Sequence, residues 1–239
     1  ESRVEGNIAR YSAGGMKVLS GSTAESCVVT QNAALNENNA SGGGGGIWVY
    51  QSNLYGCTVR HNTAPREGGG VHAYLSEVSN CTIEWNDAGR HGGGLFMEWG
   101  TTTGCRIGEN RAGVNGDTNY SKGGGIYAKF NATVANSYVQ GNQAIDGEGG
   151  AIWADATLSS NIEALTITGI VATLNTARTG GGVYADQKVR LFNSDIEHNT
   201  ASYRGGGVYV DRNSLVSGCT LSNNVAAQEG GAAAISSAI

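Results

Sequence analysis

The sequence predicts an all-β chain folded as a parallel β-helix, a solenoid of about nine stacked coils of 24–31 residues. Three observations predict it: a repeated asparagine–alanine marker, a glycine cluster in most repeats, and short stretches of alternating inward and outward residues. Internal periods of this length are typical of solenoids, because one repeat cannot bury its apolar face alone. We expect a single domain over residues 1–239.

The marker is an asparagine followed two residues later by an alanine. An aliphatic residue usually stands three residues before it and a serine or cysteine five residues before; the seventh copy has Ala172 and Ile170 there instead. The basic period is 24–25 residues, with insertions near 36–43, 114–122 and 157–165. A column of asparagines can form an amide ladder that bonds each coil to its neighbours. We expect this ladder to contain Asn32, Asn62, Asn86, Asn110, Asn142, Asn199 and Asn224, and the same marker occurs at Asn7 and Asn175.

A glycine cluster and then a second short strand follow each marker, as in Gly-Gly-Gly-Val-His at 68–72. Glycine allows sharp bends with positive φ and close approach of neighbouring backbones. Stretches such as Cys57–Val59 and Val71–Ala73 have the two-residue period of a strand, so alternate side chains point inward. Stacked coils would lie about 4.8 Å apart.

Composition excludes several classes of protein. The chain has 39 glycines but one proline, Pro65, and no Gly-X-Y period, which excludes collagen. A hydrophobic content of 39% and a net charge of −5 exclude a disordered chain and argue against a nucleic-acid partner. No apolar run is long enough to span a membrane in this segment.

Two tetrapeptides carry a resemblance to known repeats. Gly149-Gly150-Ala151-Ile152 is a Gly-Gly-Ala-Ile sequence, and Val59–Asn62 is one of several [Val/Ile/Leu]-x-x-Asn sequences that stand where Phe-x-x-Asn is expected. The chain resembles the right-handed parallel β-helix repeats of bacterial surface proteins, nearest to the polymorphic outer-membrane protein and autotransporter passenger type. This resemblance implies a secreted or cell-surface location, and it extends to adhesins and polysaccharide-active enzymes.

One outward position in the strand after the glycines forms a column of rings. We expect these rings to be exposed at intervals of about 4.8 Å. They could stack on one another and stabilise the sheet, be covered by the inserted loops, contact a partner chain, or bind sugars. The candidate ligand- or partner-binding residues are Trp48, His72, Phe96, Tyr127, Trp153, Tyr184 and Tyr209.

A second outward column, two residues further on, ends in Asp155, Asp186 and Asp211. Rung spacing would separate these carboxylates by about 5 Å and 10 Å, which brackets the carboxylate pairs of glycosidases. The three aspartates are therefore weak catalytic candidates. A carboxylate row could instead hold Ca²⁺, the one cofactor that we consider, or could simply mark the end of each strand.

All five cysteines occupy one equivalent position and should point inward as small buried side chains. A linear column cannot give the tetrahedral convergence of a zinc site, and the four histidines show no metal-ligand spacing. We therefore expect no metal site among the cysteines and histidines.

The chain begins and stops inside a coil, without a charged or helical cap. These uncapped ends predict a segment of a longer parent chain or a subunit that associates end to end. The sequence thus favours a non-catalytic extracellular structural or adhesive solenoid: a surface passenger, a stalk or a head-to-tail filament subunit. The alternative is a polysaccharide-binding or polysaccharide-cleaving β-helix of the lyase or glycosidase type, so enzyme activity stays an open question.

Overall fold

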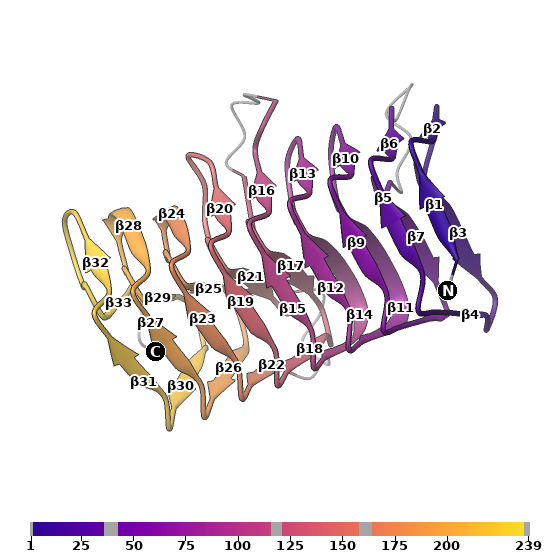
Figure 1. Ribbon diagram of the computed structural model, residues 1–239. Coiled ribbons are helices and arrows are strands. Elements are labelled where there is room, and N and C mark those ends of the chain that lie inside the picture. Colours follow the sequence, from indigo (N-terminus) through magenta and orange to yellow (C-terminus); the bar gives the residue numbers. More distant parts are fainter. Residues whose placement is uncertain (1, 36–42, 116–120, 158–163, 237–239) are drawn as a thin grey trace.

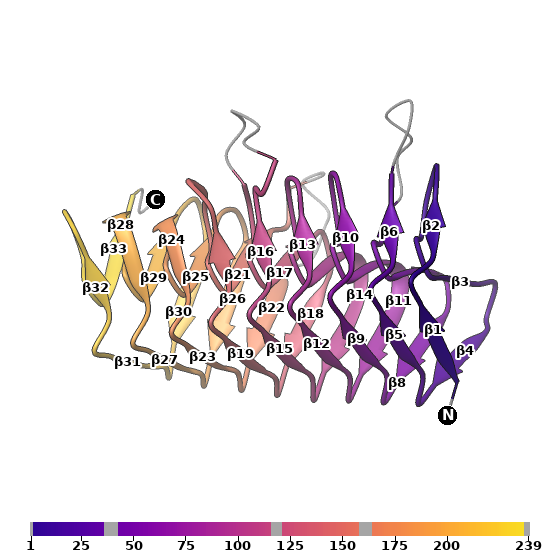
Figure 2. The same ribbon diagram turned by 45° about the horizontal axis from the view of Figure 1, so that its top comes forward.

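The computed structural model describes residues 2–35, 43–115, 121–157 and 164–236, and the predicted insertions lie largely outside these ranges. Every regular element in the described ranges is a β-strand, which confirms the all-β prediction. The strands pair in parallel and form three long sheets, A, B and C, around one elongated core (Figures 1 and 2). The fold is thus a parallel β-solenoid. Among the described residues, no helix is long and apolar enough to cross a membrane.

Sheets A and B each contain nine short strands. In order of pairing, sheet A consists of β1 (Arg3–Glu5), β5 (Val28–Thr30), β9 (Thr58–Arg60), β12 (Thr82–Glu84), β15 (Arg106–Gly108), β19 (Tyr138–Gln140), β23 (Val171–Thr173), β27 (Asp195–Glu197) and β31 (Thr220–Ser222). Sheet B consists of β2 (Ile8–Ala9), β6 (Ala33–Ala34), β10 (Thr63–Ala64), β13 (Asp87–Ala88), β16 (Arg111–Ala112), β20 (Gln143–Ala144), β24 (Thr176–Thr179), β28 (Thr200–Arg204) and β32 (Val225–Ala226).

Sheet C has two halves, which β11 (Val71–Ser79) and β14 (Leu95–Thr103) join by running through both. The half that follows the glycine clusters contains β3 (Met16–Leu19), β7 (Ile47–Tyr50), β17 (Ile126–Lys129), β21 (Ile152–Asp155), β25 (Val183–Ala185), β29 (Val208–Val210) and β33 (Ala233–Ile235). The other half contains β4 (Thr23–Glu25), β8 (Asn53–Tyr55), β18 (Thr133–Ala135), β22 (Leu165–Thr168), β26 (Val189–Phe192) and β30 (Leu215–Ser217). Each repeat therefore has more strands than the two that alternation predicts.

The core consists of inward side chains that repeat in register from one rung of paired strands to the next. Val59 pairs with Ile83, which pairs with Ile107, and all three are fully buried. The seventh marker keeps this register although its residues differ, because Ala172 pairs with Ile196 and remains buried. The buried Ile170 occupies the usual serine or cysteine position of that repeat. A large and a small side chain have thus exchanged places, which conserves the core volume.

The glycine clusters allow neighbouring backbones to touch. A Cβ atom on Gly93 would lie 2.4 Å from the carbonyl oxygen of Gly124 and 2.5 Å from the carbonyl carbon of Arg111. Gly92, one residue earlier, has a φ of 62°, a left-handed conformation that favours glycine. Side chains at these bends would therefore force the rungs apart.

The asparagine ladder is continuous along the described rungs and includes Asn7 and Asn175. The backbone N–H and the side-chain Nδ2 of each asparagine donate to the Oδ1 of the next asparagine at 2.9–3.0 Å. The Nδ2 of Asn86 also donates to the carbonyl oxygens of Val59 and Glu84. The asparagines from Asn32 to Asn199 are almost fully buried, so each amide satisfies its bonding capacity inside the protein.

Candidate functional site

The outer face of the first half of sheet C carries two parallel columns of side chains. The aromatic column is in strict register from rung to rung and consists of Trp48, His72, Phe96, Tyr127, Trp153, Tyr184 and Tyr209. The second column lies two residues further along each strand and consists of Tyr50, Tyr74, Glu98, Lys129 and Asp155, continued by Asp186 and Asp211.

The rings of the aromatic column stack on each other. Phe96 and Tyr127 are 4.6 Å apart between ring centroids and nearly parallel, and Tyr127 and Trp153 are 4.7 Å apart. Tyr184 and Tyr209 form another stack at 4.8 Å. Rings in this arrangement cover each other's faces and leave their edges toward solvent.

The expectation that this column is exposed was wrong for most of its members. Only Trp48 and Tyr184 are half-buried, whereas the rest are buried: His72, Phe96, Tyr127, Trp153 and Tyr209. Mutual stacking is one cause. The other is a third column of polar residues, each directly before a glycine cluster, which covers the rings from outside. Glu148 accepts a hydrogen bond from Trp153 Nε1 at 3.1 Å, and Lys122 Nζ lies 4.0 Å from the Trp153 ring.

The three aspartates follow one another on successive rungs, as predicted, but each is engaged in local bonds. The buried Asp155 accepts hydrogen bonds from the backbone and hydroxyl of Thr157. Arg212 donates to Asp186 at 2.6 Å and lies 3.7 Å from Asp211. Burial raises the pKa of Asp186 above its ordinary range, against the opposing effect of Arg212.

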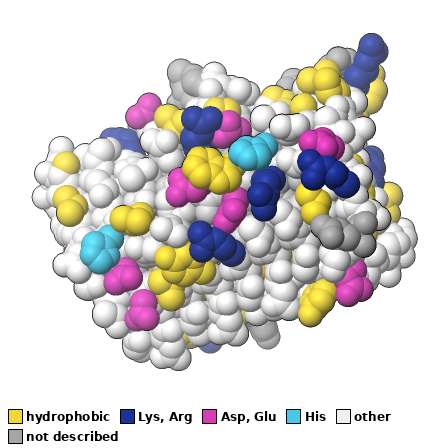
Figure 3. All heavy atoms as spheres, viewed as in Figure 1, with side chains coloured by type: hydrophobic (Ala, Val, Ile, Leu, Met, Phe, Trp, Pro, Cys, Tyr) yellow, Lys and Arg dark blue, Asp and Glu magenta, His cyan; other side chains and the backbone are white. Residues whose placement is uncertain are grey.

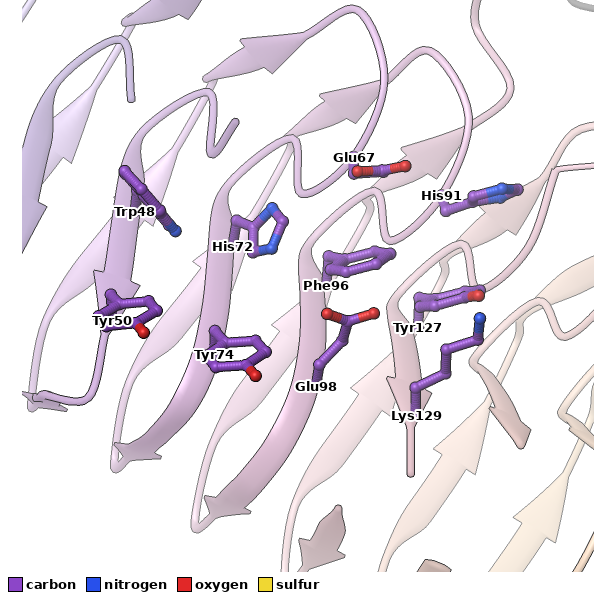
Figure 4. A pocket seen from close by; sticks show the side chains of 10 residues that line it. All are labelled: Trp48, Tyr50, Glu67, His72, Tyr74, His91, Phe96, Glu98, Tyr127 and Lys129. Atoms are coloured by element: carbon purple, nitrogen blue, oxygen red, sulfur yellow. The ribbon is translucent and has the colours of Figure 1, made fainter. Parts of the chain in front are cut away.

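A pocket of about 460 Å³ opens where the two columns run side by side (Figure 4). Four rungs contribute one residue from each column, and two residues before glycine clusters complete the wall. The lining residues are Trp48, Tyr50, Glu67, His72, Tyr74, His91, Phe96, Glu98, Tyr127 and Lys129. Glu67 and His91 were absent from the sequence-based candidates. The two residues form an isolated parallel bridge between neighbouring rungs. A polar residue recurs directly before the glycine cluster in several repeats, and this recurrence is the sequence signal that could have identified them.

Burial governs the electrostatics of this pocket. It lowers the pKa of His72 to about 4, and together with nearby cationic side chains it lowers that of His91 to about 4. Both imidazoles are therefore neutral at pH 7, and the Nδ1 atom of each is buried without a hydrogen-bond partner among the described residues. Burial also raises the pKa of Glu98, which Lys129 opposes and Glu67 reinforces.

The cysteine column lies on the inner side of the solenoid, remote from this pocket. All five cysteines are free thiols, and Cys57, Cys81 and Cys105 are buried. The Sγ of Cys81 donates to the carbonyl oxygen of Ser79 at 3.3 Å, and a hydrogen bond with Cys105 is the main cause that raises the pKa of Cys81 to about 12. Within the described ranges, no group of three or more His, Cys, Asp or Glu residues could hold a metal ion.

The opposite face, formed by sheets A and B, has a different character. Side chains of both charges lie there among single hydrophobic ones (Figure 3). Ion pairs connect neighbouring rungs, such as Arg106–Glu84 at 2.7 Å and Arg111–Asp87 at 2.6 Å. Exposed pairs of this kind contribute little to stability individually.

Comparison with known proteins gives no match to a family model, to a curated protein or to a solved structure. Inference about the function of this chain therefore depends on its own geometry. The pocket combines aromatic rings, two carboxylates, one ammonium group and two neutral imidazoles, which together can bind a ligand that is both apolar and rich in hydrogen-bonding groups.

Proposed function

We propose that this chain is a right-handed parallel β-helix of about nine coils that serves as a non-catalytic structural or adhesive rod at a cell surface or outside the cell. It would act as a passenger segment, a stalk or a filament subunit, by likeness to the repeats of bacterial surface passengers. The observation that carries the proposal is the continuous asparagine ladder, which runs beside the main-chain ladders of all three sheets.

A continuous ladder supports such a role because it makes the molecule stiff along its axis. Each described rung bonds to its neighbours through backbone groups in three sheets and through one asparagine amide, which is buried from Asn32 to Asn199. Bending the rod would stretch these bonds on one side, and nine rungs at about 4.8 Å give a length of roughly 40 Å. A stiff object of defined length is suited to hold a binding surface away from its point of attachment.

Small-angle scattering and negative-stain imaging of the purified chain over a concentration series test this proposal. Single rods at every concentration would support a stalk or passenger segment. Fibres of the same width that lengthen with concentration would support a filament subunit. Compact, rounded particles, or scattering that requires a flexible chain, would contradict the proposal in either form.

Polysaccharide binding is a second candidate function, and the pocket on sheet C favours it. The three aspartates give no such support to polysaccharide cleavage. Asp186 and Asp211 share Arg212, and Asp155 is hydrogen-bonded to Thr157. A binding role is compatible with the adhesive form of the rod.

A further inference from the structure

We propose that the pocket on the outer face of sheet C is a carbohydrate-binding site for a short, uncharged oligosaccharide. His72, Glu98 and Lys129 would bond to sugar hydroxyl groups, and the ring of Tyr74 would pack against the C–H face of one sugar. This inference rests on the proposed adhesive function and names the class of ligand that the rod would bind.

The first argument is a break in the stacking of the second column. Tyr50 and Tyr74 stack at 5.3 Å with an angle of 5° between their rings. The next residue in register is Glu98, so this stack ends at Tyr74, which makes no second ring contact with a described residue. Tyr74 therefore lines the pocket with no second ring stacked on it, whereas Phe96 and Tyr127 cover each other. Ring faces carry partial negative charge and attract the weakly positive C–H groups of a pyranose.

The second argument is an unsatisfied polar group in the wall. His72 is only 7% exposed, and its Nδ1 has no hydrogen-bond partner among the described residues. Buried polar atoms in folded proteins nearly always have a partner, so a lone one requires an explanation. A neutral imidazole offers one donor and one acceptor, and rotation of the His72 ring toward the pocket would bring the buried atom within reach of a sugar hydroxyl. The Nδ1 of His91, which also lines the pocket, is likewise buried without a hydrogen-bond partner among the described residues.

The third argument is the balance of charge and the shape. Glu67 and Glu98 provide acceptors and Lys129 provides donors, which leaves one net negative charge when both imidazoles are neutral. Such a mixture suits a polyhydroxylated ligand better than a strongly charged one. The pocket extends over four rungs, or about 14 Å at the usual spacing, and its 460 Å³ falls within the range of small-ligand sites. A linear ligand along the rod axis matches this elongated form.

A panel of immobilised cello-, chito-, malto- and xylo-oligosaccharides, followed by titration calorimetry with the bound member, tests the proposal. We expect binding by the wild-type chain and at least a tenfold weaker affinity for His72→Phe and Tyr74→Leu. Phenylalanine keeps a ring against Phe96, 4.6 Å away, and removes a desolvated polar group, so His72→Phe should retain or gain thermal stability while it loses affinity. Tyr209→Phe, in the same column but outside the pocket, is the matched control and should bind as the wild type does.

Three results would overturn this assignment: no oligosaccharide bound by the folded wild-type chain at millimolar concentration, equal affinity of the wild type and both pocket variants, or tighter binding of tetramethylammonium than of any saccharide. Imaging of the same preparations separates this outcome from failure of the proposed function. A rod that binds no sugar refutes only the carbohydrate site, whereas a rounded or flexible particle refutes the rod itself.

Discussion

Replacement of one asparagine in the middle of the ladder should destabilise the whole rod. Asn86 is fully buried, and its Oδ1 accepts from both the backbone and the side chain of Asn62 at 3.0 Å. Its Nδ2 donates to Val59 and to Asn110. Asn86→Ala removes these four bonds between rungs, each of which contributes about 1 kcal/mol. We therefore expect unfolding free energy to fall by about 4 kcal/mol and the melting temperature by roughly 8–16 °C.

An isosteric variant separates hydrogen bonding from packing. In Asn86→Asp one carboxylate oxygen still accepts from Asn62, but the other faces the carbonyl oxygen of Val59 and the Oδ1 of Asn110 without a proton to share. This variant should be at least as unstable as Asn86→Ala at pH 7 and should partly recover in acid, where the carboxyl is protonated.

Thermal unfolding followed by circular dichroism, with urea titrations, measures both variants. The control is Asn7→Ala, because Asn7 is exposed and, among the described residues, its side chain bonds only to Glu5 and Asn32, so we expect a loss of about 1 kcal/mol or less. Equal stability losses at Asn86 and Asn7, or a loss under 1 kcal/mol at Asn86, would refute the cooperative role of the ladder.

Three further predictions concern protonation, backbone approach and thiol access. As the pH is lowered from 6.5 to 4, the unfolded chain protonates His72 while the folded chain largely does not. The free energy of unfolding should therefore decrease by about 3 kcal/mol through this residue. Urea titrations at pH 7 and pH 4 should show that the wild type loses about 3 kcal/mol more unfolding free energy than His72→Phe does. Equal losses in the two proteins would contradict this prediction. Gly93→Ala should lower the free energy of unfolding by about 3 kcal/mol or prevent folding, because its Cβ would clash with the next rung. Gly6→Ala, whose Cβ would meet nothing within 4 Å, should lower it by only about 1–2 kcal/mol, because of the φ of 68°. Similar urea midpoints for the two variants would be inconsistent with this reasoning. A thiol reagent should modify the half-buried Cys27 and Cys219 in the folded chain and reach the other three cysteines only after unfolding, so rapid reaction of all five would show that the core is open.

Much of the architecture followed from the sequence because its signals recur once in every repeat. The asparagine marker and the inward aliphatic residue three positions before it both recur in register in the structure, as Val59, Ile83 and Ile107 illustrate. The second half of sheet C was missed. Four of its separate strands have three residues and contribute one inward side chain each, such as Leu54 or Val134, and so short a stretch gives no periodicity to detect.

The sequence predicted which face of the sheet the site residues lie on, but it did not predict how deeply they are buried. Alternation along the strand correctly placed Phe96 and Tyr127 on the outer face of sheet C. Their burial depends on contacts from other rungs and from residues before the glycines, such as His91, whose ring lies 5.1 Å from that of Tyr127. This contact joins residues 36 positions apart in the chain (127 − 91), and no local sequence pattern reveals it. The end of the ring stack at Tyr74 is likewise evident only once Glu98 is known to follow it in register.

The asparagine ladder also gives the rod a polarity. From Asn32 to Asn199, each side-chain amide donates to the carbonyl oxygen of the following asparagine, and its own carbonyl oxygen accepts from the preceding one. The amide dipoles are therefore aligned, and they add along the axis as peptide dipoles add along a helix. A coil inserted in the opposite sense would place oxygen against oxygen or hydrogen against hydrogen. The side chains thus enforce one direction of stacking, independently of the direction that the backbone imposes.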